Sequence, residues 1–423
     1  MPAVEDVEQR RTDLLRPSLL APRQLERRDP RQPQRRIRRR QRLLTRPVMV
    51  AIMVSLVWRR LPALAAVQKV WAREGMRWVT PRRVSPQALT TRLDVLPAAV
   101  RGQLCAEVGA RLQPQAPPVV PPPSWGPVRE HVPRLAMVDG STWEARRHKS
   151  PVVRERAGVV RAGTLLVLVE AFSHRPLWHR DTEDAWAHDQ RCGAAILAAL
   201  PVGGLRVCDL GLFSVRWFDD FTAATKFFVT RRREKTASRT VRVLNHRPDD
   251  QDELMHVGQY RSNPGTSPWR MVAVRWQGVW YRSLTHVLAP QVLSARQVCE
   301  RSRRRWRSEE ACALTTRRLD VADVWTGSSH GVQVQIYATL VFYAVLVTLG
   351  LQVAQALGEP LERISVEMVF RAFSHDSRAV QHGEGDELVA FLAEHAKLLG
   401  LVKRRRRQHR ERQERESSMW GDP

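Results

Sequence analysis

The chain has 423 residues, of which 43% are hydrophobic, and its formal net charge is +26 at pH 7. This apolar content excludes a wholly disordered chain, and the length suffices for two or three domains. A pI near 11.3 implies a polyanionic partner, either nucleic acid or an anionic membrane. Only 6 of the 69 basic residues are lysine. Such an excess of arginine suits bidentate phosphate binding, and it equally suits a GC-rich coding sequence.

Cysteine and histidine are placed without any metal-ligand spacing. The five cysteines include no CxxC pair, and the histidines include no HxxxH pair. This pattern argues against a disulfide framework and against a zinc site. The N-terminus also lacks the apolar core of a signal peptide. We therefore expect a protein of a reducing cytoplasm.

The N-terminal third divides by composition into three parts. Residues 1–47 hold 14 arginines against 6 acidic residues without helical or strand periodicity, which predicts a disordered basic arm. Residues 48–113 show apolar residues at helical spacing and predict a helical domain. The run Pro114–Pro123 contains six prolines. It predicts an extended linker, which we place at residues 114–131.

Residues 132–357 alternate between strand and helix patterns, which favours a mixed-sheet α/β core. The sequence predicts two helices, at 184–200 and 215–224, and a β-rich insertion at about 236–290. Further helices are expected at 294–319 and 332–357. The predicted strands of the core are 135–139, 158–160, 164–170, 205–209 and 226–230.

The C-terminal part combines apolar helices with a basic end. Residues 358–402 predict a helical region, and residues 403–423 predict a basic tail. The segment Tyr337–Gly350 holds 14 uncharged residues, short of the ~20 that a membrane span requires, so a buried core helix is expected there. The alternative is a basic membrane-surface protein that is anchored by this segment.

The first candidate acid stands at the predicted end of strand 135–139. Asp139 follows Leu135 and Met137 at a spacing of two, so the three residues are expected on one strand face. Gly140 would then let the backbone turn sharply. Taken alone, this pattern is more typical of an aspartate in a turn than of a catalytic residue.

Two further acids extend the pattern. Asp209 ends the predicted strand 205–209 in the same way, before Gly211. Later, Arg305 precedes Glu309 by four residues, so both are expected on one helical face. Two strand-end aspartates and a helical glutamate are suitable ligands for two divalent metals in phosphoryl transfer on nucleic acid. The alternative for this last segment is a phosphate-binding basic face with an incidental acid.

These motifs together resemble a DDE transposase of the insertion-sequence-4 family. The run Arg305-Trp-Arg-Ser-Glu-Glu-Ala-Cys is similar to the family block Arg-Trp-x-Ile-Glu-x-x-Phe. The runs Val138-Asp-Gly-Ser-Thr and Cys208-Asp-Leu-Gly-Leu-Phe resemble the blocks around the two aspartates. The strand Phe227-Phe-Val-Thr-Arg-Arg-Arg and the segment 319–337 follow in the family's order. The resemblance covers about residues 50–400.

The resemblance implies a ribonuclease-H-like mixed-sheet core with a β-rich insertion, a helical N-terminal domain that binds DNA, and basic tails. It implies metal-dependent strand cleavage and strand transfer at the ends of an insertion sequence, catalysed by Asp139, Asp209 and Glu309 with two Mg²⁺ ions, which Mn²⁺ can replace. The implied partners are the terminal inverted repeats and target DNA, bound by a homodimer in the bacterial cytoplasm at the nucleoid. The implied DNA-binding residues are Arg231, Arg304, Arg305 and Trp306.

Four residues depart from the family pattern around the glutamate. Ser302 stands where the family has tyrosine, and Thr316 stands where it has lysine. Both family residues contact transposon-end DNA. Ser308 and Cys312 replace isoleucine and phenylalanine, which thins the packing of the helix. The alternative function is therefore a decayed or domesticated transposase that binds DNA without cutting it.

Overall fold

The computed structural model describes the chain over the following residues: 44, 48–49, 52–53, 56–57, 59, 64–74, 83–94, 107–119, 121, 125–142, 164–182, 192–208, 213–233, 236–258, 264–276, 278–304, 329–381 and 388–403. These residues separate into two compact units. One unit contains Val108–Pro117 and the chain from Val345 onward, and the other contains the remaining described residues up to Ala344. The predicted basic arm 1–47, apart from Leu44, and the tail beyond residue 403 lie outside the described residues, as does the predicted strand 158–160.

The larger unit begins with helices that pack through a small apolar core. Helix α5 spans Leu64–Glu74 and helix α6 spans Pro86–Asp94. Val67 and Trp71 of α5 and Leu89 and Leu93 of α6 are fully buried. Both pairs are spaced by four residues, which places each pair on one helical face. Helix is thus present where the sequence predicts it, while the domain boundaries 48–113 stay a prediction.

The predicted linker 114–131 contains a helix at its C-terminal end. Helix α8 spans Gly126–His131, and Pro127 occupies its first turn, where a missing N–H costs no hydrogen bond. Trp125 and Val128 are buried. These two apolar residues explain why the chain stops being extended before the predicted boundary.

Five strands form the core of the sheet. Strand β1 spans Leu135–Thr142 and pairs antiparallel with β2, Thr164–Glu170, which pairs antiparallel with β3, Pro176–Thr182. Strands β4, Leu205–Cys208, and β5, Phe227–Arg231, lie parallel to β1 on its other side. The order is therefore β3-β2-β1-β4-β5, which confirms the prediction of a mixed α/β core.

Four further strands extend the same sheet beyond β5. They are β6, Ser238–Arg247, β7, Asp250–Val257, β8, Trp269–Trp276, and β9, Val279–Thr285. All four pair antiparallel, and β9 joins β5 through three residue pairs. Strand β6 forms the free edge, and its pairing with β7 is interrupted by two register shifts. These strands lie inside the range 236–290 that the sequence marks as β-rich.

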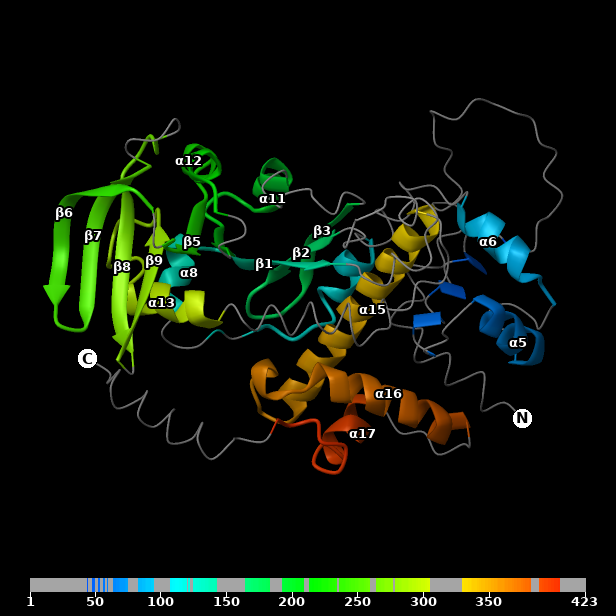
Figure 1. The fold of residues 1–423 in the computed structure, drawn as a ribbon. Coiled ribbons are helices and arrows are strands. Elements are labelled where there is room, and N and C mark those ends of the chain that lie inside the picture. The colour runs from blue at the N-terminus through cyan, green and yellow to red at the C-terminus, as the bar shows by residue number, and fades with distance from the viewer. Residues whose placement is uncertain are drawn as a thin grey trace. The chain divides into compact units, whose positions relative to one another are not determined.

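Helices cover both faces of this sheet (Figure 1). Helices α11, Gly193–Ala199, and α12, Val215–Ala223, lie on one face. Their residues share a buried cluster with Ala136 and Val138 of β1. Helix α13, Ala295–Arg304, packs on β4, β5 and β7–β9 from the opposite face. The fully buried Phe218 of α12 stacks on Phe228 of β5 with ring centroids 4.1 Å apart.

The apolar helix near the C-terminus lies close to the predicted range 332–357, but its uncharged part is longer than the 14 residues considered in the sequence analysis. Helix α15 spans Ser329–Ala356, and its part Gly331–Ala356 is long and apolar enough to cross a membrane. The expectation that this segment is too short was wrong, because the glutamines Gln335 and Gln352 interrupt neither the helix nor its uncharged character. Of the most apolar window, 89% is buried inside the structure, as in a core helix of a folded protein.

The smaller unit completes the described chain with short helices. They are the 3-10 turn η5, Leu361–Arg363, helix α16, Val366–Gln381, and helix α17, Leu388–Glu394. A bridge between Ile364 and Val402 joins the start of this segment to its end. The backbone N–H of Ser365 donates to the carbonyl of Leu401 at 2.8 Å, and that of Lys403 donates to Arg363 at 2.7 Å. The last described residues are thus held by backbone bonds.

The contact between α11 and α12 gives the first testable prediction. A Cβ added at Gly193, the first residue of α11, would lie 2.5 Å from Nε1 of the buried Trp217. We expect Gly193→Ala to lower the free energy of unfolding by about 1–3 kcal/mol, because the indole has to move within a packed core. The measurement is urea denaturation followed by circular dichroism.

A matched control exists in α8. Gly126 is also the first residue of a short helix, and an added Cβ there meets nothing within 4 Å. Gly126→Ala should change the unfolding free energy by less than about 0.5 kcal/mol. Equal effects of the two substitutions would contradict the predicted clash.

Candidate active site

The parallel strands β1, β4 and β5 are in register, so their carboxyl ends meet at one edge of the sheet. Met137 is paired with Val207, and Val207 is paired with Val229. The pairing of β4 with β5 continues to Cys208 and Thr230. Ligands of α/β sheets commonly bind outside the carboxyl ends of such strands. The predicted strand-end acids are therefore expected at this edge.

Asp139 lies in β1, two residues beyond the pair Met137–Val207, and its backbone pairs with Val167 of β2. The expectation that the strand ends at Asp139 was wrong. Gly140 pairs with Leu166, and β1 continues to Thr142. Strand β2 is long enough to pair with this second half of β1, so the expected turn at Gly140 does not form.

The other predicted catalytic residues lie outside the described part of the chain. Strand β4 ends at Cys208, the residue before Asp209. Helix α13 ends at Arg304, whose side chain is not described, and Arg305, Trp306 and Glu309 follow it. The structure thus places the backbone of Asp139 and the strand that leads to Asp209 at one edge. It brings none of the three carboxylates into a described contact.

Arg231 is the predicted DNA-binding residue that the structure describes in full. It is the last residue of β5, directly after the pair Cys208–Thr230, and its side chain is exposed. It therefore stands at the same edge as Asp139 and the end of β4. Its pairing partner in β9 is Ser283. An exposed guanidinium at this edge is available to a phosphate group.

Two further arginines follow at the same edge, and the sequence analysis did not single them out. The guanidinium of Arg232 donates to Oγ of Ser238 at 3.1 Å, and its backbone N–H donates to the carbonyl of Arg282 at 3.0 Å. The guanidinium carbon of Arg233 lies 5.3 Å from the ring centroid of Phe213, and Arg233 is exposed. The signal was the run of three consecutive arginines after an apolar strand.

The alternation of side chains along β4 shows which residues belong to each face of the sheet. The guanidinium carbon of Arg206 lies 3.8 Å from the ring centroid of Trp217 and 5.5 Å from that of Phe221, both in α12. Arg206 is fully buried. Because side chains alternate along a strand, the neighbouring Leu205 and Val207 belong to the opposite face, which α13 covers.

Helix α13 begins at a reciprocal cap. The backbone N–H of Ser294 donates to Oε1 of Gln297 at 2.8 Å, and the N–H of Gln297 donates to Oγ of Ser294 at 3.3 Å. This capping box satisfies donors that the first turn leaves without helical partners. Val298 and Cys299 are then buried against the sheet. Burial raises the pKa of the Cys299 thiol to about 12, so it stays protonated.

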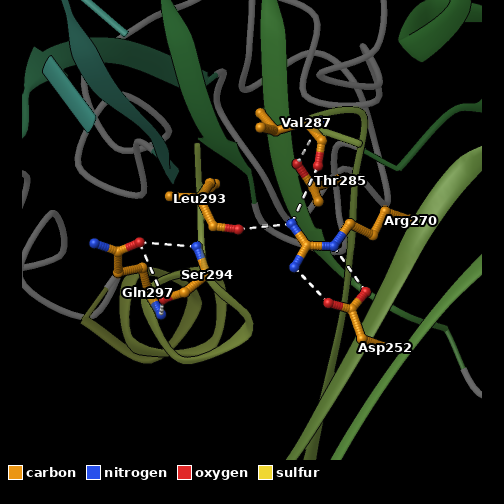
Figure 2. A network of polar contacts seen from close by, with 7 residues as sticks. All are labelled: Asp252, Arg270, Thr285, Val287, Leu293, Ser294 and Gln297. Atoms are coloured by element: carbon orange, nitrogen blue, oxygen red, sulfur yellow. Dashed lines mark hydrogen bonds and ion pairs between the residues drawn. The ribbon is translucent and has the colours of Figure 1, made fainter. Parts of the chain in front are cut away.

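A buried ion pair joins the start of α13 to the extended part of the sheet (Figure 2). Arg270 of β8 donates through Nε and Nη2 to the carboxylate of Asp252 in β7, at 2.7 and 2.5 Å. Its Nη1 donates to the carbonyl of Leu293 at 2.6 Å and to that of Val287 at 3.3 Å. The guanidinium of Arg270 thereby connects β8 to β7, to the segment after β9, and to Leu293, the residue that precedes the cap of α13.

Ser302, one of the departures from the family pattern, lies in α13. Its side chain is only 8% exposed. A residue at this position is turned into the protein and is not open to DNA in the described structure.

Two further groups with perturbed pKa values lie in β3 and β7. Burial lowers the pKa of His179 in β3 to about 4, against the raising effect of Asp181. Burial, and secondarily the neighbouring Asp252, raises the pKa of Asp250 in β7. Within the described residues, no group of three or more histidine, cysteine or acidic side chains could hold a metal ion.

Comparison with known proteins gives little beyond this geometry. No protein-family model matches the sequence, and none of the curated proteins matches it. Among solved structures, the piggyBac transposase synaptic complex with hairpin DNA matches with a TM-score of 0.40 and 8% sequence identity. The match covers 86% of this chain and 79% of that chain. A likeness of this size assigns no function.

The Arg270–Asp252 pair gives the second prediction. Arg270→Met leaves the buried Asp252 carboxylate without its bidentate partner, and we expect it to lower the free energy of unfolding by about 3–5 kcal/mol. Asp252→Asn should cost a similar amount because it leaves the guanidinium charge buried. The measurement is thermal and urea unfolding of the full chain.

The double variant Arg270→Met with Asp252→Leu is the decisive control. It replaces both charges by apolar groups and should be markedly more stable than either single variant, because no uncompensated charge remains. Additive losses in the double variant would show that the two residues act independently.

Proposed function

We propose that this chain is a DNA transposase of the insertion-sequence-4 type, which cleaves and transfers strands at the ends of a mobile element. The proposal depends on one observation. Asp139 lies in β1 just beyond its pairing with β4, β4 ends at Cys208, the residue before Asp209, and the exposed Arg231 ends the neighbouring β5. Phosphoryl transfer on nucleic acid uses carboxylates that hold metal ions and cations that bind the phosphate.

Strand alternation supports the convergence of the two aspartates. Ala136 and Val138 belong to the α12-side cluster, and Arg206 contacts α12. Continued along each strand, this alternation would give positions 139 and 209 the face that α13 covers. Glu309 follows α13 by five residues. In the proposed site, the three acids would act from this face of the sheet.

The order of the elements supports a ribonuclease-H-like core. Three antiparallel strands come first, and two helix-connected parallel strands, β4 and β5, follow. The four-stranded segment β6–β9 is inserted between β5 and α13, which agrees with the insertion that the resemblance implies between Asp209 and Glu309. We infer that Val132–Leu357 functions as one catalytic domain with this insertion.

The donor chemistry of the proposed site fits Mg²⁺ or Mn²⁺. Asp139, Asp209 and Glu309 offer only carboxylate oxygens, the ligands these hard cations prefer. The parallel pairing of β1 with β4, up to Met137 and Val207, supports a site in which the first two would be neighbours. When bound, two such ions would supply a nucleophile at neutral pH and stabilise charge on the leaving oxygen.

The chain's own cations would hold the DNA. Arg231 and Arg233 are exposed at the edge and would each contact a phosphate. Arg304 and Arg305 would clamp a phosphate near the glutamate, and Trp306 would stack on a displaced base or pack in the core. The net charge of +26 would add affinity that does not depend on sequence. The proposed partners are transposon ends and target DNA, bound by a homodimer at the bacterial nucleoid.

A decayed or domesticated transposase that binds DNA without cutting it is the second candidate. The specific observation in its favour is Ser302, whose burial leaves no side chain for the DNA contact that a tyrosine makes in the family. Thr316, which stands where the family has lysine, is a further departure. The two candidates predict equal DNA affinity and differ in cleavage.

The catalytic proposal is tested by plasmid nicking. Supercoiled plasmid that carries the DNA flanking the gene is incubated with the full chain and Mg²⁺ or Mn²⁺. Asp139→Ala, Asp209→Ala and Glu309→Gln should each reduce nicking to the level seen without metal, while retention of the plasmid in a gel-shift assay stays unchanged. Glu310→Gln is the matched control, because residue 310 is rotated about 100° from 309 on a helix.

The outcomes separate the two candidates. Nicking that depends on all three acids supports the enzyme. Binding without metal-dependent nicking by the unaltered chain supports the decayed element. Nicking that persists in Asp209→Ala would exclude the proposed carboxylate site.

Phosphate binding at the edge is tested by salt dependence. Arg231→Ala should flatten the slope of log K against log salt by about 0.9, the effect of one lost phosphate contact on duplex DNA. Arg371 is a matched control, because it is exposed in α16 and bonded to Glu367 at 2.7 Å. Arg371→Ala should leave the slope unchanged. Equal slopes for the Arg231 variant and the unaltered chain would remove Arg231 from the DNA-binding surface.

A further inference from the structure

Three arginines with exposed side chains lie on β6, the free edge strand of the sheet (Figure 1). Their pairs with β7 are Arg239 with His256, Arg242 with Leu254, and Arg247 with Asp250. These partners are two and four residues apart in β7, whose pairing with β8 shows no register shift, so they belong to one face of the sheet. Because residues that pair across strands share a face, the three arginines lie on one face of β6.

Two β-bulges bring the arginines onto that face. In a regular strand, the spacings of three residues from 239 to 242 and of five from 242 to 247 would put neighbouring arginines on opposite faces. The pairing with β7 passes over Val241 in the first interval and Leu244 in the second. Each extra residue restores the common face, since a bulge redirects the side chains that follow it. The row of arginines is therefore a product of both bulges.

The row belongs to the face of the sheet that α13 covers, because the alternate β7 residues Met255 and Val257 are part of the α12-side cluster. Two acids of β7 share the face of the row. Asp252 is buried and bound by Arg270, and Asp250 lies opposite Arg247 and within electrostatic range of the exposed Arg296. Positive charge therefore predominates on this face of the β6–β7 hairpin.

The free edge is poorly suited to pairing with another strand. Bulges interrupt its line of backbone groups, and exposed charges on an edge strand oppose the addition of a further strand. A second copy of the chain would bring the same three guanidinium groups, and like charges repel. The row therefore fits an anionic partner, and the net charge of +26 indicates that this partner is a polyanion.

The spacing of the row suits a phosphodiester backbone. The steps between the three β7 partners correspond to ~7 and ~14 Å along the strand, so the row is ~20 Å long. Phosphates of one DNA strand follow each other every ~3.4 Å along the duplex axis. Arg239, Arg242 and Arg247 would therefore each reach a different phosphate. Asn245, which pairs with Asp252 between Arg242 and Arg247, adds an amide donor to the same row.

We propose that β6 is a second DNA-binding surface, on which the three arginines hold the phosphate backbone of a duplex without reading its base sequence. Guanidinium groups bind phosphates through paired N–H donors, and such contacts position a duplex without specifying its sequence. Strand β6 is separated from β5, which carries Arg231, by β9, β8 and β7, a distance of about 19 Å across the sheet. Binding here requires neither metal ions nor the proposed carboxylate ligands.

The first experiment measures the affinity of the full chain for a short duplex of random sequence by fluorescence anisotropy, with a chelator and at several salt concentrations. The triple variant Arg239→Gln, Arg242→Gln, Arg247→Gln should lower the slope of log K against log salt by about 2.7, the effect of three lost phosphate contacts. The matched control removes three exposed arginines from α8, α12 and α16, as Arg129→Gln, Arg216→Gln, Arg371→Gln. It should leave the slope unchanged.

The second experiment tests whether the common face matters. Arg242→Val with Val243→Arg exchanges two neighbouring residues and keeps both composition and net charge. Val243 pairs with Glu253 on the opposite face and is 54% exposed, so a long side chain is accommodated there. The exchange should lower the slope by about 0.9, as Arg242→Gln should. The melting temperature of each variant should equal that of the unaltered chain, because the altered side chains are exposed.

Three results would overturn the proposal. The first is an equal slope for the triple variant and the unaltered chain. The second is an unchanged slope in the exchange variant, because net charge alone would then account for binding. The third is loss of binding to phosphatidylserine vesicles in the triple variant with DNA binding retained, which would assign the row to a membrane surface. Failure of the nicking test would refute only the proposed catalysis, since these binding measurements contain no free metal.

Discussion

The rest of the larger unit depends on a single buried guanidinium. Arg270 binds a carboxylate on the adjacent strand and two carbonyls on the segment that enters α13. A charge so far from water is tolerated because each bond is charge-assisted and the partner acid is buried with it. Strands β7 and β8 and the first turn of α13 therefore cannot shift separately.

Local patterns were enough for much of the core. Strand β2 was predicted over its observed range, because six of the seven residues at 164–170 are apolar or β-branched. Helix α12 was predicted to within one residue. Gly140 was misread because a glycine after an aspartate is a turn signal only when no neighbouring strand continues to pair. Strand β3 was missed, since Pro176 and alternating polar residues are typical of loops as well as of edge strands.

The candidate site was predictable in part, and the limit is set by distance along the chain. The acids and Arg231 are marked by short apolar runs that end in charged residues, which is local information. The packing of Arg301 in α13 against the rings of Trp125 and Phe172 is not, because the three residues are scattered over more than 170 positions and meet only in the folded state. The sequence alone shows that Ser302 departs from the family pattern, whereas its burial follows from the packing of α13.

The pairing of β5 with β9 has a consequence for how the chain folds during synthesis. Thr230 pairs with Leu284, more than 50 residues later in the chain. Until β9 has left the ribosome, the outer edge of β5 presents unpaired backbone groups beside an apolar strand. Contacts of such sequence separation form slowly, because loop closure precedes any gain in pairing. The newly made half-sheet is therefore the state of this protein that most needs protection from association with other chains.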